Sequence, residues 1–230
     1  MALVTTSVLT ACSVKPEERE SRAAEALAKK YHREFEITQV YPQKLGELYY
    51  EVQAYPVNEP QVRFTAAVDT EDDRISDTYV VRCVCAAISR RAAENLNEMP
   101  GYYYLFTHTI GPQPIVEDAE ITIKDYAALD PDNRFRIEAF VVPEEKGAGV
   151  FYDSLGKIYS GLEYLDGDVR LFVVDEEQMG SIQAFFDEND DVNFDFLMLT
   201  EKFVSYEIPY ADGKIRVGRD AFAEMTKGVL

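Results

Sequence analysis

The sequence reads LYYEVQAY at residues 48–55 and VRFTAAVD at residues 62–69, and both stretches alternate apolar with polar side chains. A period of two with one apolar face predicts half-buried strands of an antiparallel sheet. The short connection at residues 58–60 predicts that the two strands are neighbours. A further strand, rich in β-forming residues, is predicted at residues 35–41, and the turn at 42–46 joins it to the others. These three strands form an antiparallel meander.

Two amphipathic helices flank this meander. The first is predicted over residues 17–33, where Ala24, Leu27, Ala28 and Tyr31 recur at helical spacing and Pro16 suits the first helical position. The second is predicted over residues 77–98, capped by Ser76 or Asp77. Its apolar face consists of Val81, Cys85, Ile88, Ala92 and Leu96. A strand at 79–85 is the alternative, but the helical period continues to Leu96 and favours a helix.

The second half of the chain alternates strands with helices. Strands are predicted at residues 102–110, 135–141, 169–173, 203–208 and 215–217, and helices at 122–129, 155–165, 176–186 and 220–227. We therefore predict an α+β fold, with an N-terminal helix packed on an antiparallel meander and a mixed helix/strand half after it. The expected segments are a signal-peptide remnant at 1–12, a tether at 13–20, and folded units at 21–110 and 115–230. One continuous domain is the alternative to the last division.

The chain is strongly acidic. Its 230 residues include 42 acidic and 23 basic side chains, which gives a net charge of −19. Such a surface repels nucleic acid and anionic lipid headgroups, so we expect no nucleic-acid partner. It can attract a basic protein or a cation, although high negative charge also simply keeps an exported protein soluble.

The N-terminal run at residues 3–12 is uncharged and mostly apolar, and it ends in Leu9-Thr10-Ala11-Cys12 before the chain turns polar. This pattern resembles the lipobox of bacterial lipoproteins, in which an apolar segment and small residues precede the cleavage site. The resemblance implies that Cys12 is acylated and becomes the N-terminus of a protein anchored to the outer face of the bacterial cell membrane. The positive segment of the family is missing between Met1 and Cys12, so we expect further residues upstream. A short buried strand and a disordered terminus are the alternatives.

The strongest catalytic pattern is Ser154-Leu155-Gly156-Lys157. It matches the S-x-x-K motif of penicillin-binding proteins and class A β-lactamases, in which Ser attacks an acyl carbon and Lys one helical turn later helps to deprotonate it. The supporting S-D-N and K-T-G motifs are absent from the sequence, which counts against a catalytic role for Ser154 and Lys157. The alternative is a serine in the first turn of a helix, with Lys157 in solvent.

An acidic stretch at residues 187–195 offers the only metal-like spacing. Asp187, Asn189 and Asp191 mimic the first half of an EF-hand loop, but Val192 replaces the required Gly and Met198 stands in place of the bidentate Glu. We therefore favour an ordinary loop over a calcium site. The histidines, His32 and His108, carry no zinc or triad motif and are expected at the surface or its boundary. No nucleotide-binding motif is present, and we expect no cofactor.

We therefore expect an exported, lipid-anchored, extracytoplasmic protein with a non-catalytic binding or accessory role at the cell envelope. The partner implied by the lipobox is the membrane, through the anchor on Cys12. One alternative is a serine acyl-hydrolase that uses Ser154 and Lys157. Another is a cytosolic acidic interaction protein, which the sequence upstream of Met1 would distinguish from an exported one.

Overall fold

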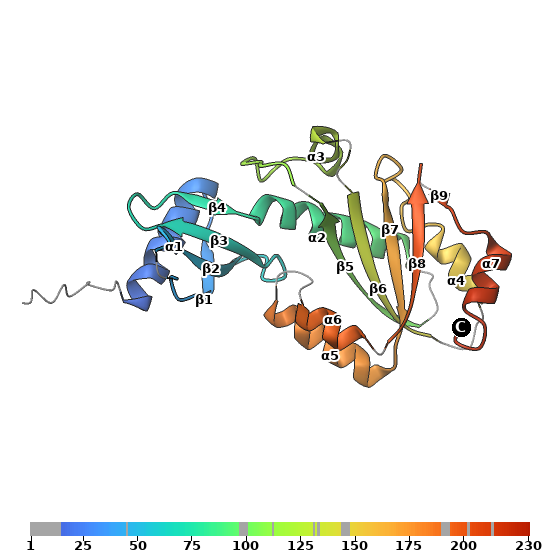
Figure 1. Ribbon diagram of the computed structural model, residues 1–230. Helices are drawn as coiled ribbons and strands as arrows, with labels where there is room; N and C mark the ends of the chain where they lie inside the picture. The colour runs from blue at the N-terminus through green and yellow to red at the C-terminus, as the bar shows by residue number, and fades with distance from the viewer. Residues whose placement is uncertain are drawn as a thin grey trace, which may run out of the picture.

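The computed structural model describes residues 15–44, 46–96, 101–111, 113–130, 132, 134–143, 148–189, 194–201, 203–212 and 214–230. It confirms an α+β fold with a four-stranded antiparallel sheet followed by a five-stranded mixed sheet (Figure 1). The predictions for residues 1–12, Cys12 included, and for Asp191 lie outside the described residues. Among the described helices, none combines the length and the hydrophobicity needed to cross a membrane.

The first unit is an N-terminal helix on an antiparallel meander, as predicted. Its elements are α1 (Pro16–Tyr31), β1 (Phe35–Val40), β2 (Tyr49–Pro56), β3 (Phe64–Asp69) and β4 (Ile75–Asp77), and the strand order is β1-β2-β3-β4. The alternating pattern places Val52 and Phe64 on the face that packs against Leu27 of α1. The period of two is preserved in the burial of β3, whereas Val52, Gln53 and Ala54 of β2 are all buried, and the Gln53 side chain donates to the Glu188 carbonyl at 3.1 Å.

The ends of α1 follow simple capping rules. Pro16 occupies the first turn, where its missing N–H leaves no hydrogen bond unmade. At the other end His32 adopts a left-handed conformation, with φ +55°, and its N–H donates to the Ala28 carbonyl at 2.8 Å. This C-cap turns the chain sharply into β1.

The helix α2 (Tyr79–Asn95) belongs to the cores of both units. Cys85, Ile88 and Ala92 lie in the core of the second unit, whereas Tyr79 lies in the core of the first. The predicted apolar face is thus confirmed. The predicted cap is wrong: Thr78 is the N-cap residue, without a side-chain cap bond.

The second unit is built on a mixed sheet. Its strands are β5 (Tyr102–Ile110), β6 (Arg134–Val142), β7 (Gly167–Val173), β8 (Val204–Ala211) and β9 (Lys214–Ile215), in that order. The pair β6–β7 is parallel, and the other neighbours are antiparallel. Strand β5, which we expected in the first unit, pairs along its whole length with β6. The boundary expected after residue 110 therefore does not separate the two sheets.

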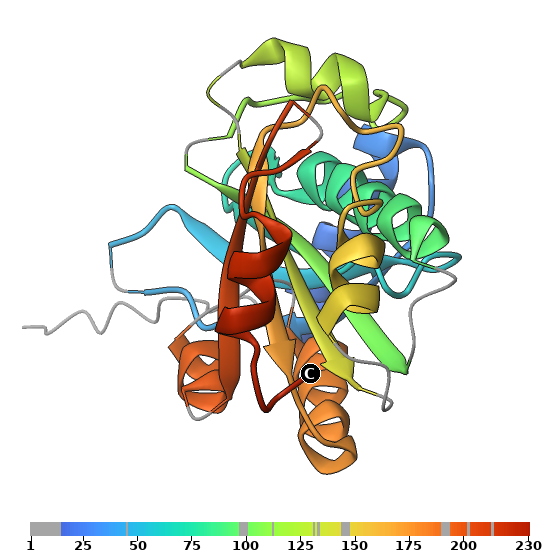
Figure 2. The same ribbon diagram turned by 90° about the vertical axis from the view of Figure 1, so that its right-hand side faces the viewer.

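Helices cover the mixed sheet on both faces (Figure 2). One face packs against α2 together with α3 (Ile123–Leu129), α4 (Ala148–Leu155) and α7 (Arg219–Met225). The other packs its aromatic end, including Phe140 and Phe172, against α5 (Glu176–Glu188) and α6 (Phe194–Thr200). A capping box starts α5, because the Asp175 carboxylate accepts from the Gln178 N–H at 2.8 Å and the Gln178 side chain accepts from the Asp175 N–H.

One helix prediction in the second half is wrong. The helix expected at residues 155–165 lies earlier, as α4, and residues 156–162 form successive turns. The N–H groups of Ile158, Leu162 and Leu165 each donate three residues back. Such turns repeat every three residues and bury the same apolar positions as a helix would. Strand β4 and helix α6 are additional elements that the sequence did not reveal.

Candidate functional site

Three hollows meet on one side of the first unit, around the ammonium group of Lys30 and the carboxylate of Glu117. The largest, of about 590 Å³, lies between α1 and the β3–β4 hairpin. The others, of about 400 and 250 Å³, lie beside the end of α1 and beside β4. Lys30 and Glu117 line all three hollows, so we treat them as one site, the Lys30 groove. A hollow into which polar groups converge from several elements is typical of a binding site.

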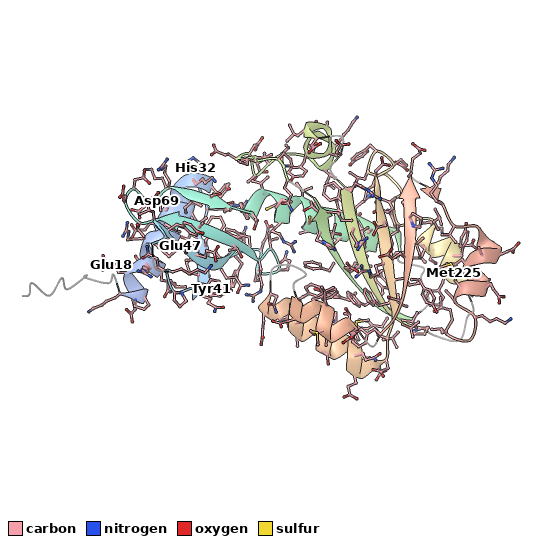
Figure 3. All side chains as sticks on the ribbon, viewed as in Figure 1. Glu18, His32, Tyr41, Glu47, Asp69 and Met225 are labelled. Atoms are coloured by element: carbon pink, nitrogen blue, oxygen red, sulfur yellow. The ribbon has the colours of Figure 1, made fainter. Side chains whose placement is uncertain are left out.

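Four segments that are distant in sequence form the walls of this groove. They are the second half of α1, the hairpin at residues 72–75, the corner at 75–81 between β4 and α2, and the irregular segment at 113–120. The hairpin turns at Asp73, which has φ +57°, a conformation that Asp tolerates better than most residues. Figure 3 labels His32, which lines the second hollow where α1 ends.

The floor of the groove is organised by the buried carboxylate of Asp77, whose side chain is 1% exposed. It accepts from the Lys30 ammonium at 3.0 Å, from the Tyr31 hydroxyl at 2.8 Å and from the Tyr79 N–H at 2.9 Å. Burial raises the pKa of Tyr31 well above its usual range, and the charge of Asp77 raises it further, so the hydroxyl stays a donor. These bonds hold α1, β4 and α2 together at one point.

A second polar chain continues from this floor. Arg33 donates to the Tyr79 hydroxyl at 2.5 Å and lies 3.8 Å from a carboxylate oxygen of Glu59 and 3.9 Å from one of Glu120. Cys83 lies close to Tyr79, and burial raises the pKa of its thiol to about 11. A thiol with a raised pKa is a poor nucleophile at neutral pH. This corner of the groove therefore offers binding contacts rather than a reactive group.

The largest hollow carries charges of both signs. Its cationic side chains are Arg22, Lys29, Lys30 and Arg74, and its acidic ones are Glu25, Asp72, Asp73 and Glu117. Arg22 donates to Asp73 at 2.8 Å, and Arg74 lies 2.7 Å from Asp72. Within the described part of the chain, neither Lys29 nor Glu117 takes part in an ion pair. Both exposed groups are thus available to a charged ligand.

The pair Ser154 and Lys157 does not have the geometry of an activated nucleophile. Ser154 is the second-last residue of α4, not in the first turn of a helix, and only 7% of it is exposed. Lys157 lies in the following turn, where its N–H donates to the Ser154 carbonyl at 2.9 Å. The negative end of the helix dipole would also disfavour an oxyanion beside Ser154.

The two calcium candidates that the structure describes, Asp187 and Asn189, are not placed as EF-hand ligands. Asp187 belongs to the last turn of α5, whereas the first EF-hand ligand opens a loop. Asn189 is the C-cap of that helix, and its side-chain amide donates to the Phe185 carbonyl at 2.8 Å. No group of three or more metal-binding side chains is found in the described ranges.

A second polar cluster lies on the part of the mixed sheet beyond α5 and α6. His108 was expected near the surface but is buried, 2.9 Å from a carboxylate oxygen of Glu138. Arg170 lies 4.0 Å from the other oxygen of Glu138 and 3.3 Å from Glu207. The acids and bases alternate across β6, β7 and β8, the pattern that stabilises neighbouring strands. We assign this cluster a structural role.

The sequence missed the groove altogether. Lys30, Asp77 and Glu117 come from three separate segments, and no local motif connects them. Asp77 attracted attention only as a possible helix cap. To predict the groove from the sequence, one would have to know that β4 exists and that segment 113–120 folds back beside it.

The comparisons with known proteins concern the fold. No protein-family model matches the chain, and no curated protein matches it. The structure is similar to the crystal structure of a DUF5037 family protein from Ruminococcus gnavus ATCC 29149, with a TM-score of 0.70. The two share 15% sequence identity, and the match covers 92% of this chain and 100% of that one. At this identity the similarity shows a shared fold alone.

Proposed function

We propose that the protein is a bacterial lipoprotein, anchored through Cys12 at the outer face of the cell membrane, and that it acts there by non-catalytic binding through the Lys30 groove. The binding role is supported by one observation above all, the convergence of three hollows on Lys30 and Glu117. The anchor is supported by the Leu9-Thr10-Ala11-Cys12 pattern. The first helix begins at Pro16, so a lipid on Cys12 would hold the first unit close to the bilayer.

The anchor is tested with the protein expressed from its own gene in a bacterial host. We expect the protein to partition into detergent, its intact mass to show acyl chains on Cys12, and Cys12→Ala to abolish both. An uncleaved, unmodified N-terminus in the host would contradict the anchor.

The binding role is tested by photo-crosslinking in the same host. A photo-reactive amino acid replaces exposed Lys29 in the groove or, as a control, exposed Glu224 on α7. We expect an adduct from the groove position and none from α7. Adducts from α7 alone would contradict the assignment of the groove.

The hydrolase alternative is tested with a fluorescent phosphonate probe for activated serines. We expect no labelling, because Ser154 is nearly buried and lies at the C-terminal end of α4, where the helix dipole disfavours an oxyanion. Labelling that disappears in Ser154→Ala would overturn the non-catalytic proposal.

A further inference from the structure

The edge of the first sheet opens onto the groove. Strand β4 pairs with β3 alone, and the pairing bonds run from the Asp69 N–H to the Arg74 carbonyl and from the Thr78 N–H to the Thr65 carbonyl. In an antiparallel pair, residues whose N–H and C=O groups bond to the partner strand alternate with residues whose N–H and C=O groups point away from it. Ile75 and Asp77 therefore direct their N–H and C=O groups away from the sheet.

These four outward groups are almost unpartnered. In the part of the chain that the structure describes, one bond reaches them, from the Lys30 ammonium to the Ile75 carbonyl at 3.4 Å. The hollow of about 250 Å³ lies directly alongside, with residues 75–78 on one side and 113–117 on the other. A strand edge with free groups beside a hollow is the arrangement that extended peptides use when they add a strand to a sheet.

The charge and hydrophobicity of the side chains that line this hollow indicate which kind of peptide would bind. Glu117 lines the hollow, is exposed and has no ion pair among the described residues. Ile115, on the same wall, is 97% exposed and offers an apolar contact. The net charge of −19 draws basic segments to the molecule and repels acidic ones, a second copy of this chain included.

We propose that this slot binds an extended, basic segment of a partner protein, which pairs backbone to backbone with Ile75 and Asp77 and places a cationic side chain against Glu117. The inference rests on the proposed binding function of the groove. Lys30 can release the Ile75 carbonyl to the incoming strand and remain paired with Asp77 at 3.0 Å.

The probe is the capped peptide Lys-Val-Lys-Val-Lys, with Glu-Val-Glu-Val-Glu as its acidic counterpart and an N-methylated Lys-Val-Lys-Val-Lys that cannot donate backbone bonds. Amide NMR of the full chain follows binding and the hydrogen exchange of Ile75 and Asp77. We expect the basic peptide to slow exchange at both amides, and N-methylation to weaken its affinity about tenfold or more through lost hydrogen bonds. The acidic peptide should not bind.

Matched charge variants test the role of Glu117. Glu117→Gln should weaken the affinity for the basic peptide about twofold to fivefold, since an ion pair at an exposed site is weak. Glu224→Gln removes the same charge from α7 and should leave affinity unchanged. If N-methylation has no effect while peptides still shift groove resonances, strand pairing is wrong and the binding function stands. No binding, equal binding of both peptides, or strand exchange between copies of the chain would overturn the inference, whereas the crosslinking and lipid results would be unaffected.

Discussion

The four-stranded sheet packs α1 and the start of α2 on one face and meets the end of α5 at Gln53 on the other, whereas the five-stranded sheet is covered by α2, α3, α4 and α7 on one face and by α5 and α6 on part of the other. In β3 of the first sheet, buried and half-buried residues strictly alternate. In β6 of the second, five consecutive residues from Ile137 to Val141 are buried. Where the helices stop, the second sheet carries ion pairs on its remaining face, such as Arg170 with Glu207.

The two sheets are thus stabilised in different ways. The first sheet depends on a clean division between an apolar and a polar face, and it leaves an unpaired edge at β4. The second depends on close packing of both faces and on paired charges such as Glu138 with His108. Substitutions that test packing and buried charge should therefore harm the second sheet more than the first.

The largest effect is expected from Gly167→Ala at the start of β7. An added Cβ would lie 2.0 Å from the Phe135 carbonyl oxygen of β6, so the parallel pair would have to move apart. We expect the free energy of unfolding to fall by about 3 kcal/mol or more, measured by denaturant titration. Gly180→Ala in α5 is the control, because nothing lies within 4 Å and helix propensity should raise stability by about 0.5–1 kcal/mol. If the free energy of unfolding of Gly167→Ala equalled that of the wild type, the strands β6 and β7 would have to be less closely packed than this 2.0 Å approach implies.

The next effect concerns buried charge. Glu138→Ala removes a carboxylate that is 1% exposed, leaves His108 without its partner and leaves Arg170 paired with Glu207 alone among the described residues, so the free energy of unfolding should fall by about 2–3 kcal/mol. Glu51→Ala, on the uncovered face of β2, should change stability by no more than about 0.5 kcal/mol. Equal losses in thermal or denaturant unfolding would remove the distinction between the two sheets.

A smaller effect tests α2, which both units share. Burial raises the pKa of Cys83 to about 11 from 9.0, so the unfolded chain loses this proton first as the pH rises. Stability linked to Cys83 is therefore present below pH 9 and declines toward pH 11. From pH 8 to pH 10 the wild type should lose about 1 kcal/mol more than Cys83→Ala, because the buried tyrosines, Tyr31 and Tyr79 among them, lose linked stability in both proteins. The readout is denaturant unfolding at each pH, and an unchanged slope in Cys83→Ala would rule out this assignment.

The smallest effect compares helix starts. Asp175→Ala removes the carboxylate that caps α5 over the second sheet, and we expect a loss of about 1 kcal/mol. Lys15→Ala at the N-cap of α1 should be nearly neutral, because Lys15 makes no side-chain cap bond. Chemical denaturation of the two variants measures the difference between their free energies of unfolding. This difference would vanish if α5 contributed nothing to the stability of its unit.

The same contrast explains how much of the fold could be predicted. The meander and α1 were readable because one covered face leaves a period of two in the strands and a helical period in the helix. The strand β4 was missed because three residues, Ile75–Asp77, are too few to show a period. The turns after α4 imitated a helix because they repeat every three residues, close to the 3.6 residues of an α-helical turn, and bury Ile158 and Leu162 at a similar spacing.

The candidate site could not be predicted from the sequence, for a different reason. Local patterns drew attention to Ser154 and Lys157, which end a helix and its following turn. The groove depends on tertiary contacts, in which Lys30 of α1 meets Asp77 and then Glu117 from a segment far along the chain. Only the paired geometry of β3 and β4 reveals which backbone groups remain free.

The position of the groove also determines how force would travel through the molecule. The chain enters α1 at one end, near Glu18 and Glu47, and the second sheet lies toward the other end, near Met225 (Figure 3). A molecule held by its N-terminus and pulled by a partner in the Lys30 groove is stretched between α1 and β4 only. The Asp77 bonds to Lys30 and Tyr31 cross that short path, while the strands of the mixed sheet lie outside it. Single-molecule pulling from Cys12 to the groove should therefore rupture the first unit with the second still folded.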